Sequence, residues 1–198
     1  WKLLRLLPEN GYIIQPNLLN RQLPFGTMTE TTGLVGSKGG KISLILAATR
    51  PGLQLEGLDV EDLLEEFENI EKLLLTEFAV DSKETARFYE VDAQALVWSP
   101  ESPIGSFRAR TQDWPLLNEI RQILQQPVSG YSLTVASQTG IPTDEDWLQL
   151  QLEPAPRSPN SAFFALLICR KPDRKAVIDT ASRIIEIFKL SAEMLVRQ

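Results

Sequence analysis

The chain has 198 residues, of which 43% are hydrophobic and 23% are charged, and its formal net charge is −6. A chain of this size can build a globular core without disulfides or metals, and its excess of acidic residues disfavours binding to the phosphate backbone of nucleic acids. The sequence contains no histidine, which excludes Ser-His-Asp and Cys-His catalytic groups and histidine-ligated metal sites from within the chain.

Cysteine content and the apolar runs bear on the compartment. Cys169 is the only cysteine, so no intrachain disulfide forms and we expect a reducing, cytoplasmic location. The apolar run "AFFALLIC" at residues 162–169 is much shorter than the roughly 20 residues that cross a bilayer, so we expect no membrane span. The chain begins at Trp1 rather than at methionine. We expect it to be a fragment of a longer protein, with processing as the alternative.

The first 28 residues combine a short apolar stretch with residues that interrupt helices. The stretch "WKLLRLL" is long enough for a turn or two of helix, and it is followed by Pro8, Gly11, Pro16 and Pro24. Glycine and proline at this density break regular structure. We therefore predict an irregular N-terminal arm over residues 1–28.

The stretch "GLVGSKGGKISL" has the glycines and lysines of a phosphate-binding loop. A P-loop, however, requires glycine where Val35 stands and Ser or Thr where Ile42 stands, and it leads into a helix. Here the following residues are β-branched and leucine-rich. We predict two strands, residues 30–36 and 41–49, joined as a hairpin whose glycines take positive φ, with "GLQLEG" as a short extension.

The sequence pattern of residues 59–78 predicts the clearest helix of the chain, with Asp59 as its N-cap. Its apolar residues fall on one face at helical spacing: Val60, Leu63, Leu64, Phe67, Leu74, Leu75 and Phe78. Its polar residues cover the other side: Asp62, Glu65, Glu66, Glu68 and Asn69. Carboxylates in such a run can approach a hard cation, but a solvated helix face is the simpler interpretation, and we predict no metal site.

The second half of the chain mixes strands with helices. We predict strands at residues 86–99, 130–138, 146–154 and 162–169, helices at 114–126 and from 173 to the last residue, and a loop at 99–113. Alternation along the first of these strands predicts a core face made of Tyr89, Val91, Ala93, Ala95 and Val97.

These elements predict an α+β fold. We expect a mostly antiparallel sheet of five to seven strands, with about three main helices packed on it, one of them a long C-terminal helix. A single domain over residues 1–198 is the first expectation. Two lobes, residues 1–100 and 101–198, are the alternative.

The loop at residues 99–113 is the first candidate for a ligand site. Arg108 and Arg110 stand beside Phe107 and near Trp114. Arginine beside aromatic side chains can hold a carboxylate or phosphate with two hydrogen bonds, or stack on a planar ligand. An ordinary connection with surface arginines is the alternative. No cofactor is predicted, and a small anionic ligand is possible.

The final helix is the candidate interaction surface. A wide core stripe runs along it, and Ile187, Leu190 and Met194 form an additional apolar row on its flank. One helix does not easily bury both rows against a single sheet. We expect the extra row to be covered by the N-terminal arm or to contact a protein partner or a second copy of the chain.

Two classes of function follow. The first is a non-catalytic binding, regulatory or assembly module that acts through protein–protein contact. The second is an enzyme that acts on an anionic small molecule with Arg108, Arg110 and an acid from residues 144–146. Since no recognisable catalytic group is present, we favour the binding module.

Overall fold

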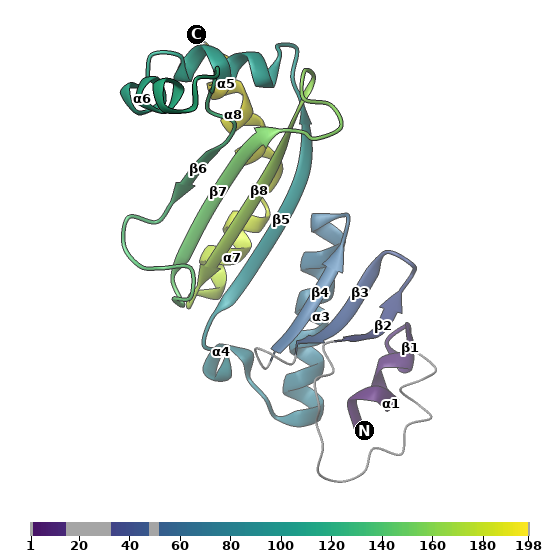
Figure 1. Ribbon diagram of the computed structural model, residues 1–198. Coiled ribbons are helices and arrows are strands. Elements are labelled where there is room, and N and C mark those ends of the chain that lie inside the picture. Colours follow the sequence, from purple (N-terminus) through teal and green to yellow (C-terminus); the bar gives the residue numbers. More distant parts are fainter. Residues whose placement is uncertain (1, 15–32, 48–51, 198) are drawn as a thin grey trace. The chain divides into compact units, whose positions relative to one another are not determined.

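The computed structural model describes residues 2–14, 33–47 and 52–197. The chain divides into two compact units, unit 1 (Trp1–Ser82) and unit 2 (Lys83–Gln198). Each unit combines helices with an antiparallel sheet, so the α+β class is confirmed (Figure 1). The single domain and the alternative of two lobes divided near residue 100 both stay predictions.

Unit 1 is built on a four-stranded antiparallel sheet in the order β1-β2-β3-β4. Its elements are helix α1 (Lys2–Glu9), strands β1 (Tyr12–Ile14), β2 (Gly33–Lys38), β3 (Ile42–Ala47) and β4 (Gly52–Gly57), and helix α3 (Val60–Phe78). Helix α1 and strand β1 lie within the stretch for which we predicted an irregular arm, and residues 15–28 of that stretch lie outside the described residues.

The predicted hairpin is confirmed as the β2–β3 connection. Gly39 and Gly40 have φ values of 58° and 68°, and the backbone N–H of Lys41 donates to the carbonyl of Lys38 at 3.1 Å. Two consecutive residues with positive φ are the signature of a type I′ turn, which glycine adopts without strain. The motif "KGGK" therefore turns the chain into strand β3, and not into the helix that follows a P-loop.

Both lysines of this turn reach helix α3. The ammonium group of Lys38 lies 2.5 Å from the carboxylate of Glu66, and that of Lys41 lies 3.0 Å from the carboxylate of Asp62. Glu66 is only 4% exposed, and its other oxygen accepts a hydrogen bond from the Tyr12 hydroxyl at 2.7 Å. A buried carboxylate is costly unless it is paired and hydrogen-bonded, and here both conditions are met.

Helix α3 has well-defined ends. The side chain of Asp59 accepts hydrogen bonds from the backbone N–H groups of Glu61 and Asp62, as an N-cap does. The helix stops at Ala79, whose φ of 52° is left-handed. Its most buried apolar residues are Ile70 and Leu73, which our predicted stripe omitted, whereas Leu75, which the stripe included, is exposed.

The core of unit 1 fills the space between α1, the sheet and α3. Its buried residues are Leu7, Tyr12, Ile14, Val35, Leu44, Ile70 and Leu73. They come from all three layers, so the amphipathic face of α3 is closed against the sheet.

Unit 2 is built on a second four-stranded antiparallel sheet in the order β5-β8-β7-β6. Its strands are β5 (Tyr89–Trp98), β6 (Leu133–Ala136), β7 (Trp147–Pro154) and β8 (Ala162–Lys171). Its helices are α5 (Pro103–Thr111), α6 (Pro115–Leu124), α7 (Arg174–Ala181) and α8 (Ile184–Val196), and the short helix α4 (Ser82–Thr85) spans the division between the units.

Helices α7 and α8 cover one face of the unit 2 sheet (Figure 1). Strand β5 alternates as predicted, with Tyr89, Val91, Ala93, Ala95 and Val97 less exposed than the residues between them. The core at one end of this face consists of Phe107, Leu152, Phe163 and Ala192. This packing brings α5 and α8 together at the strand end that begins with Ala162.

Two element predictions for unit 2 were wrong. The stretch predicted as a loop contains α5, which begins at Pro103 after an N-cap, with the Ser102 hydroxyl accepting from the N–H of Gly105 at 3.2 Å. The single C-terminal helix is two helices, α7 and α8, separated at Ser182 and Arg183. No glycine or proline lies between residues 174 and 198, so the sequence carries no signal for this break.

The sheet and helix counts also differ from the prediction. Within the described residues the chain has two sheets of four strands each, rather than one sheet of five to seven, and seven helices rather than about three. The alternation of apolar and polar residues identifies the two faces of a strand but not the strands that pair with it. The sequence therefore does not show whether the strands form one sheet or two. None of the described helices is both long and apolar enough to span a bilayer.

Candidate functional site

The predicted ligand residues lie on α5 and at the start of α6. Phe107 is 3% exposed and packs edge-to-face on Phe163, with ring centroids 6.2 Å apart. Its ring is therefore part of the core of unit 2, where such pairs stabilise packing. The hydroxyl of Thr111, one turn further along α5, donates to the carbonyl of Phe107 at 2.8 Å.

Arg110 binds the end of helix α8. Its guanidinium donates to the carbonyl oxygens of Leu195 at 2.7 Å and Met194 at 2.8 Å, and also to the carbonyl of Arg197. Carbonyl groups at a helix C-terminus lack partners within the helix, and a basic side chain satisfies them. Residues two apart in a helix lie on different sides, so the side chains of Arg110 and Arg108 leave α5 in different directions and do not share neighbours.

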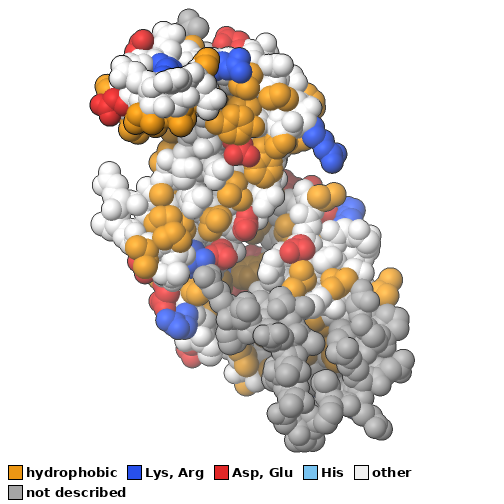
Figure 2. All heavy atoms as spheres, viewed as in Figure 1, with side chains coloured by type: hydrophobic (Ala, Val, Ile, Leu, Met, Phe, Trp, Pro, Cys, Tyr) orange, Lys and Arg blue, Asp and Glu red, His pale blue; other side chains and the backbone are white. Residues whose placement is uncertain are grey.

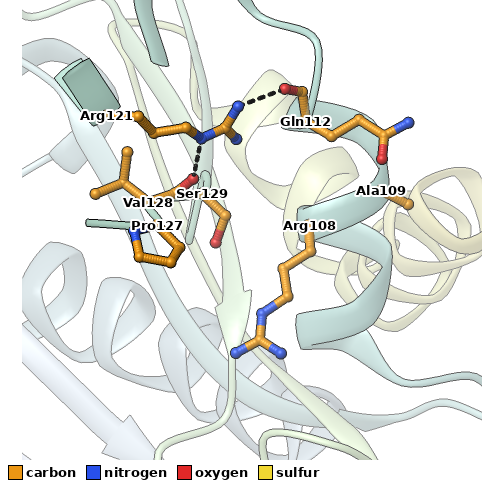
Figure 3. Close-up of a pocket in the computed structure, with 7 residues that line it drawn as sticks. All are labelled: Arg108, Ala109, Gln112, Arg121, Pro127, Val128 and Ser129. Atoms are coloured by element: carbon orange, nitrogen blue, oxygen red, sulfur yellow. Dashed lines mark hydrogen bonds between the residues drawn. The ribbon is translucent and has the colours of Figure 1, made fainter. Parts of the chain in front are cut away.

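Arg108 lines a cavity of about 490 Å³ between α5, α6 and the segment that follows α6. The lining residues are Arg108, Ala109, Gln112, Arg121, Pro127, Val128 and Ser129 (Figure 3). Arg108 makes no hydrogen bond or ion pair that we can identify within the described ranges. Of the four predicted ligand residues, it is the one that faces this cavity.

Arg121 on α6 is the second cationic residue of the cavity. Its guanidinium donates to the carbonyl oxygens of Val128 at 2.9 Å and Gln112 at 2.7 Å, and to the side-chain oxygen of Asn118 at 2.6 Å. Two of these bonds are visible in Figure 3. All three acceptors are neutral oxygens, so the side chain is held in place while its charge has no carboxylate partner among these contacts.

A close contact fixes the wall opposite α5. The N–H of Gly130 donates to the Thr111 hydroxyl at 2.8 Å, and a Cβ built on Gly130 would lie only 2.5 Å from the Thr111 methyl carbon. Only glycine permits this approach. The segment carrying Pro127, Val128 and Ser129 is therefore anchored to α5 on one side and to Arg121 on the other.

The acidic loop 139–146 lies far from this cavity. Arg170 donates to the carbonyls of Pro142 and Asp144 in that loop, whereas Phe107 packs on Phe163. The residues Phe163 and Arg170 are seven positions apart on one strand, or about 23 Å at roughly 3.3 Å per residue. The structure thus places an acid from 144–146 and Arg108 at opposite ends of β8 (Figure 1).

The acids of this second end are engaged with cations. Buried Arg170 forms an ion pair with Glu90, and Lys171 pairs with Asp146. The pKa of Asp92, on the same face of β5 as Glu90, is raised by partial burial and by the nearby Glu90 charge. These contacts fasten the loop to the sheet. Within the described ranges, no cluster of three or more acidic or thiol groups is suited to a metal.

The predicted interface row on α8 is only partly exposed. Leu190 and Met194 are 52% and 63% exposed, while Ile187 is half-buried. Ile185 is also exposed. The row therefore presents two long apolar side chains to solvent near the helix end that Arg110 caps.

Helix α6 exposes a larger apolar surface. Its amphipathic stripe comprises Leu116, Leu117, Ile120, Ile123 and Leu124, and no residue of the helix is buried. Leu116 and Ile123 are 64% and 79% exposed, and Trp114 at its N-terminus is half exposed. Hydrophobic side chains gather over this end of unit 2 (Figure 2). A helix with such a stripe normally buries it, and the periodicity that predicts the helix does not indicate that its apolar side is exposed.

Comparison of the chain with models of protein families, with curated proteins and with solved structures finds no match. Function is therefore inferred from the geometry of the described residues.

Proposed function

We propose that the chain is a non-catalytic binding module that docks onto a protein through the apolar end of unit 2. We define this docking surface as the exposed stripe of α6 (Leu116, Ile123 and Leu124) together with Leu190 and Met194 of α8. Helix α6 and the C-terminal end of α8, which Arg110 binds, lie at the same end of the unit 2 sheet (Figure 1). The proposal keeps the predicted role of α8 and adds α6 to it.

The observation that carries the proposal is the unburied stripe of α6. Three of its five apolar residues are more than half exposed, and burying them would contribute on the order of 4 kcal/mol. Isolated exposed apolar residues are normal on protein surfaces, but a contiguous helical stripe marks an interaction site. Amphipathic helices of this kind bind partners by laying the apolar face into a groove or against another helix.

Arg121 supports the same role by holding α6 in position. Since no residue of α6 is buried, the two hydrogen bonds from Arg121 to the carbonyls of Val128 and Gln112, which lie outside α6, replace part of the packing that normally orients a helix. A surface that is already ordered loses less conformational entropy when a partner binds.

The test uses a photo-crosslinking amino acid placed at Ile123, on the stripe, and in a control protein at Gln122, on the opposite side of the same helix. Each protein is irradiated alone and in an extract of the source cells. A discrete crosslinked product from position 123, absent from position 122 and lost when Leu116 is changed to Glu, is the expected result. Equal products from both positions, or none from position 123, would refute docking through α6.

A further inference from the structure

We propose that the cavity between α5 and α6 binds a small organic oxyanion, a carboxylate or phosphate that carries a compact apolar group, through the guanidinium groups of Arg108 and Arg121. This inference is independent of docking through the apolar stripe, because the lining residues and the stripe residues are different sets.

The lining of the cavity carries positive charge. Two of the seven lining residues are arginines and none is acidic. The nearest acid in sequence, Asp113, accepts a hydrogen bond from the side chain of Gln112 at 3.3 Å and is not part of the lining. Two guanidinium groups in the lining, without a carboxylate, give the cavity a positive potential, which favours binding of an anion.

Hydrogen bonds hold the guanidinium group of Arg121 in a fixed position. Its Nε and one terminal nitrogen are bound to backbone and amide oxygens, which leaves the other terminal nitrogen, for which no bond to a described residue is identified, as a donor toward the cavity. A guanidinium held by neutral acceptors is pre-organised for an anion, so binding costs less side-chain entropy.

Arg108 supplies the second set of donors. Its side chain extends from α5 on the other side of the cavity from Arg121, and the Ser129 side chain lies between the two in the view of Figure 3. A guanidinium offers paired N–H groups that match the two oxygens of a carboxylate or phosphate. The Ser129 hydroxyl adds a neutral donor to the same lining.

The size and the remaining lining define the rest of the ligand. A volume of about 490 Å³ is within the range of sites for small molecules. Ala109, Pro127 and Val128 present apolar surface beside the arginines, which favours an organic anion over an inorganic one. Benzoate and phenyl phosphate are the simplest probes of this class.

The experiment titrates the full chain with benzoate, phenyl phosphate and inorganic phosphate at constant ionic strength, and follows backbone amide resonances by NMR. We expect saturable shifts confined to residues 108–112, 118–121 and 128–130, with inorganic phosphate weaker than phenyl phosphate. The relative strength of the benzoate and phenyl phosphate arms shows which oxyanion the site prefers.

Three variants decide the outcome. Arg108→Ala should weaken the organic probes at least about tenfold, and Arg121→Lys, which keeps the charge but loses the fork, should weaken them less. Arg157→Ala, at an exposed arginine elsewhere in unit 2, should leave binding unchanged.

Equal loss in the Arg157→Ala control, shifts spread over the whole surface, or no saturation would show an adventitious ion only and overturn the site. An Ile123→Glu variant should bind the probes normally, so failure of the docking surface and failure of this site are distinguishable.

Discussion

Helices α3 and α6 are both amphipathic, yet their apolar faces lie in different environments. In α3 the apolar face is closed against the sheet of unit 1, with Ile70 and Leu73 buried. In α6 a stripe of equal clarity has no buried member. The comparison shows that helical periodicity predicts the helix and its apolar side but not what covers that side.

Charged side chains differ between the same two regions. Around α3 the cations meet acids, as in the pairs Lys38–Glu66 and Lys41–Asp62. Around α6 the cation Arg121 is held by neutral oxygens, and its neighbour Arg108 has no identified partner within the described ranges. The cations near α3 are thus paired with acids, whereas Arg121 and Arg108 make no identified ion pair within the described ranges.

The same substitution in both helices should give the largest contrast. Ile70→Ala removes a buried side chain of α3 and should cost about 3 kcal/mol of unfolding free energy, whereas Ile123→Ala on α6 should cost less than about 0.5 kcal/mol. Native-state hydrogen exchange, read in the unit that carries each change, measures both. A cost near 3 kcal/mol for Ile123→Ala would mean that the stripe of α6 is covered.

The second prediction concerns the buried carboxylate. Glu66→Ala should cost about 2 kcal/mol, because it leaves the Tyr12 hydroxyl and the Lys38 ammonium without their acceptor. Water reaches the Lys38 side chain, which is 33% exposed, and limits the loss. Arg108→Ala is the matched removal of a charge with no identified partner and should change stability by less than about 0.5 kcal/mol. Denaturant titration followed in each unit provides the comparison, and equal costs would contradict the difference between the two regions.

The smallest expected effect is a dependence on pH. Burial, together with the hydrogen bond to Glu66 and its negative charge, raises the pKa of Tyr12 above its ordinary value. The folded chain therefore holds the phenolic proton more tightly than the unfolded chain, and this contribution to stability is complete below about pH 10 and is lost as the pH rises beyond it.

Tyr12→Phe isolates that contribution. The variant should be about 1 kcal/mol less stable than the parent at neutral pH because one hydrogen bond is missing. Between pH 10 and 11 the advantage of the parent should shrink, since only the parent has this group to ionise. Unfolding free energies of both proteins across this range test the point, and a gap that does not change with pH would contradict it.

Local features of the fold were predictable from the sequence because their causes are local. The hairpin turn depends on Gly39 and Gly40, which tolerate positive φ, and the start of α3 depends on the Asp59 side chain. The signal for α5 was also present, in Ser102 followed by Pro103, an N-cap before a proline at the first helical position. Gly105 and Ser106, which follow, are poor helix formers and weaken that signal.

Features that depend on distant contacts were not predictable. Glu66 was assigned to the solvated face, although it lies one turn before Ile70 and shares its side of α3; only the positions of Tyr12 and Lys38 make its burial possible. Similarly, Arg121 is one polar residue among several on α6, and nothing in the sequence indicates that the carbonyl of Val128 lies within its reach. The candidate cavity could therefore be inferred from Arg108 alone, and only in part.

The two lysines of the hairpin turn help to set the register in which the strands of unit 1 pair. Because Lys38 and Lys41 reach carboxylates one helical turn apart, a shift of the hairpin by a single residue would move both ammonium groups away from α3 together and would turn each side chain of the shifted strand to the opposite face. The misregistered chain would then enclose an anionic Glu66 with no counter-ion. The two ion pairs thus favour the native strand register, in addition to the apolar packing.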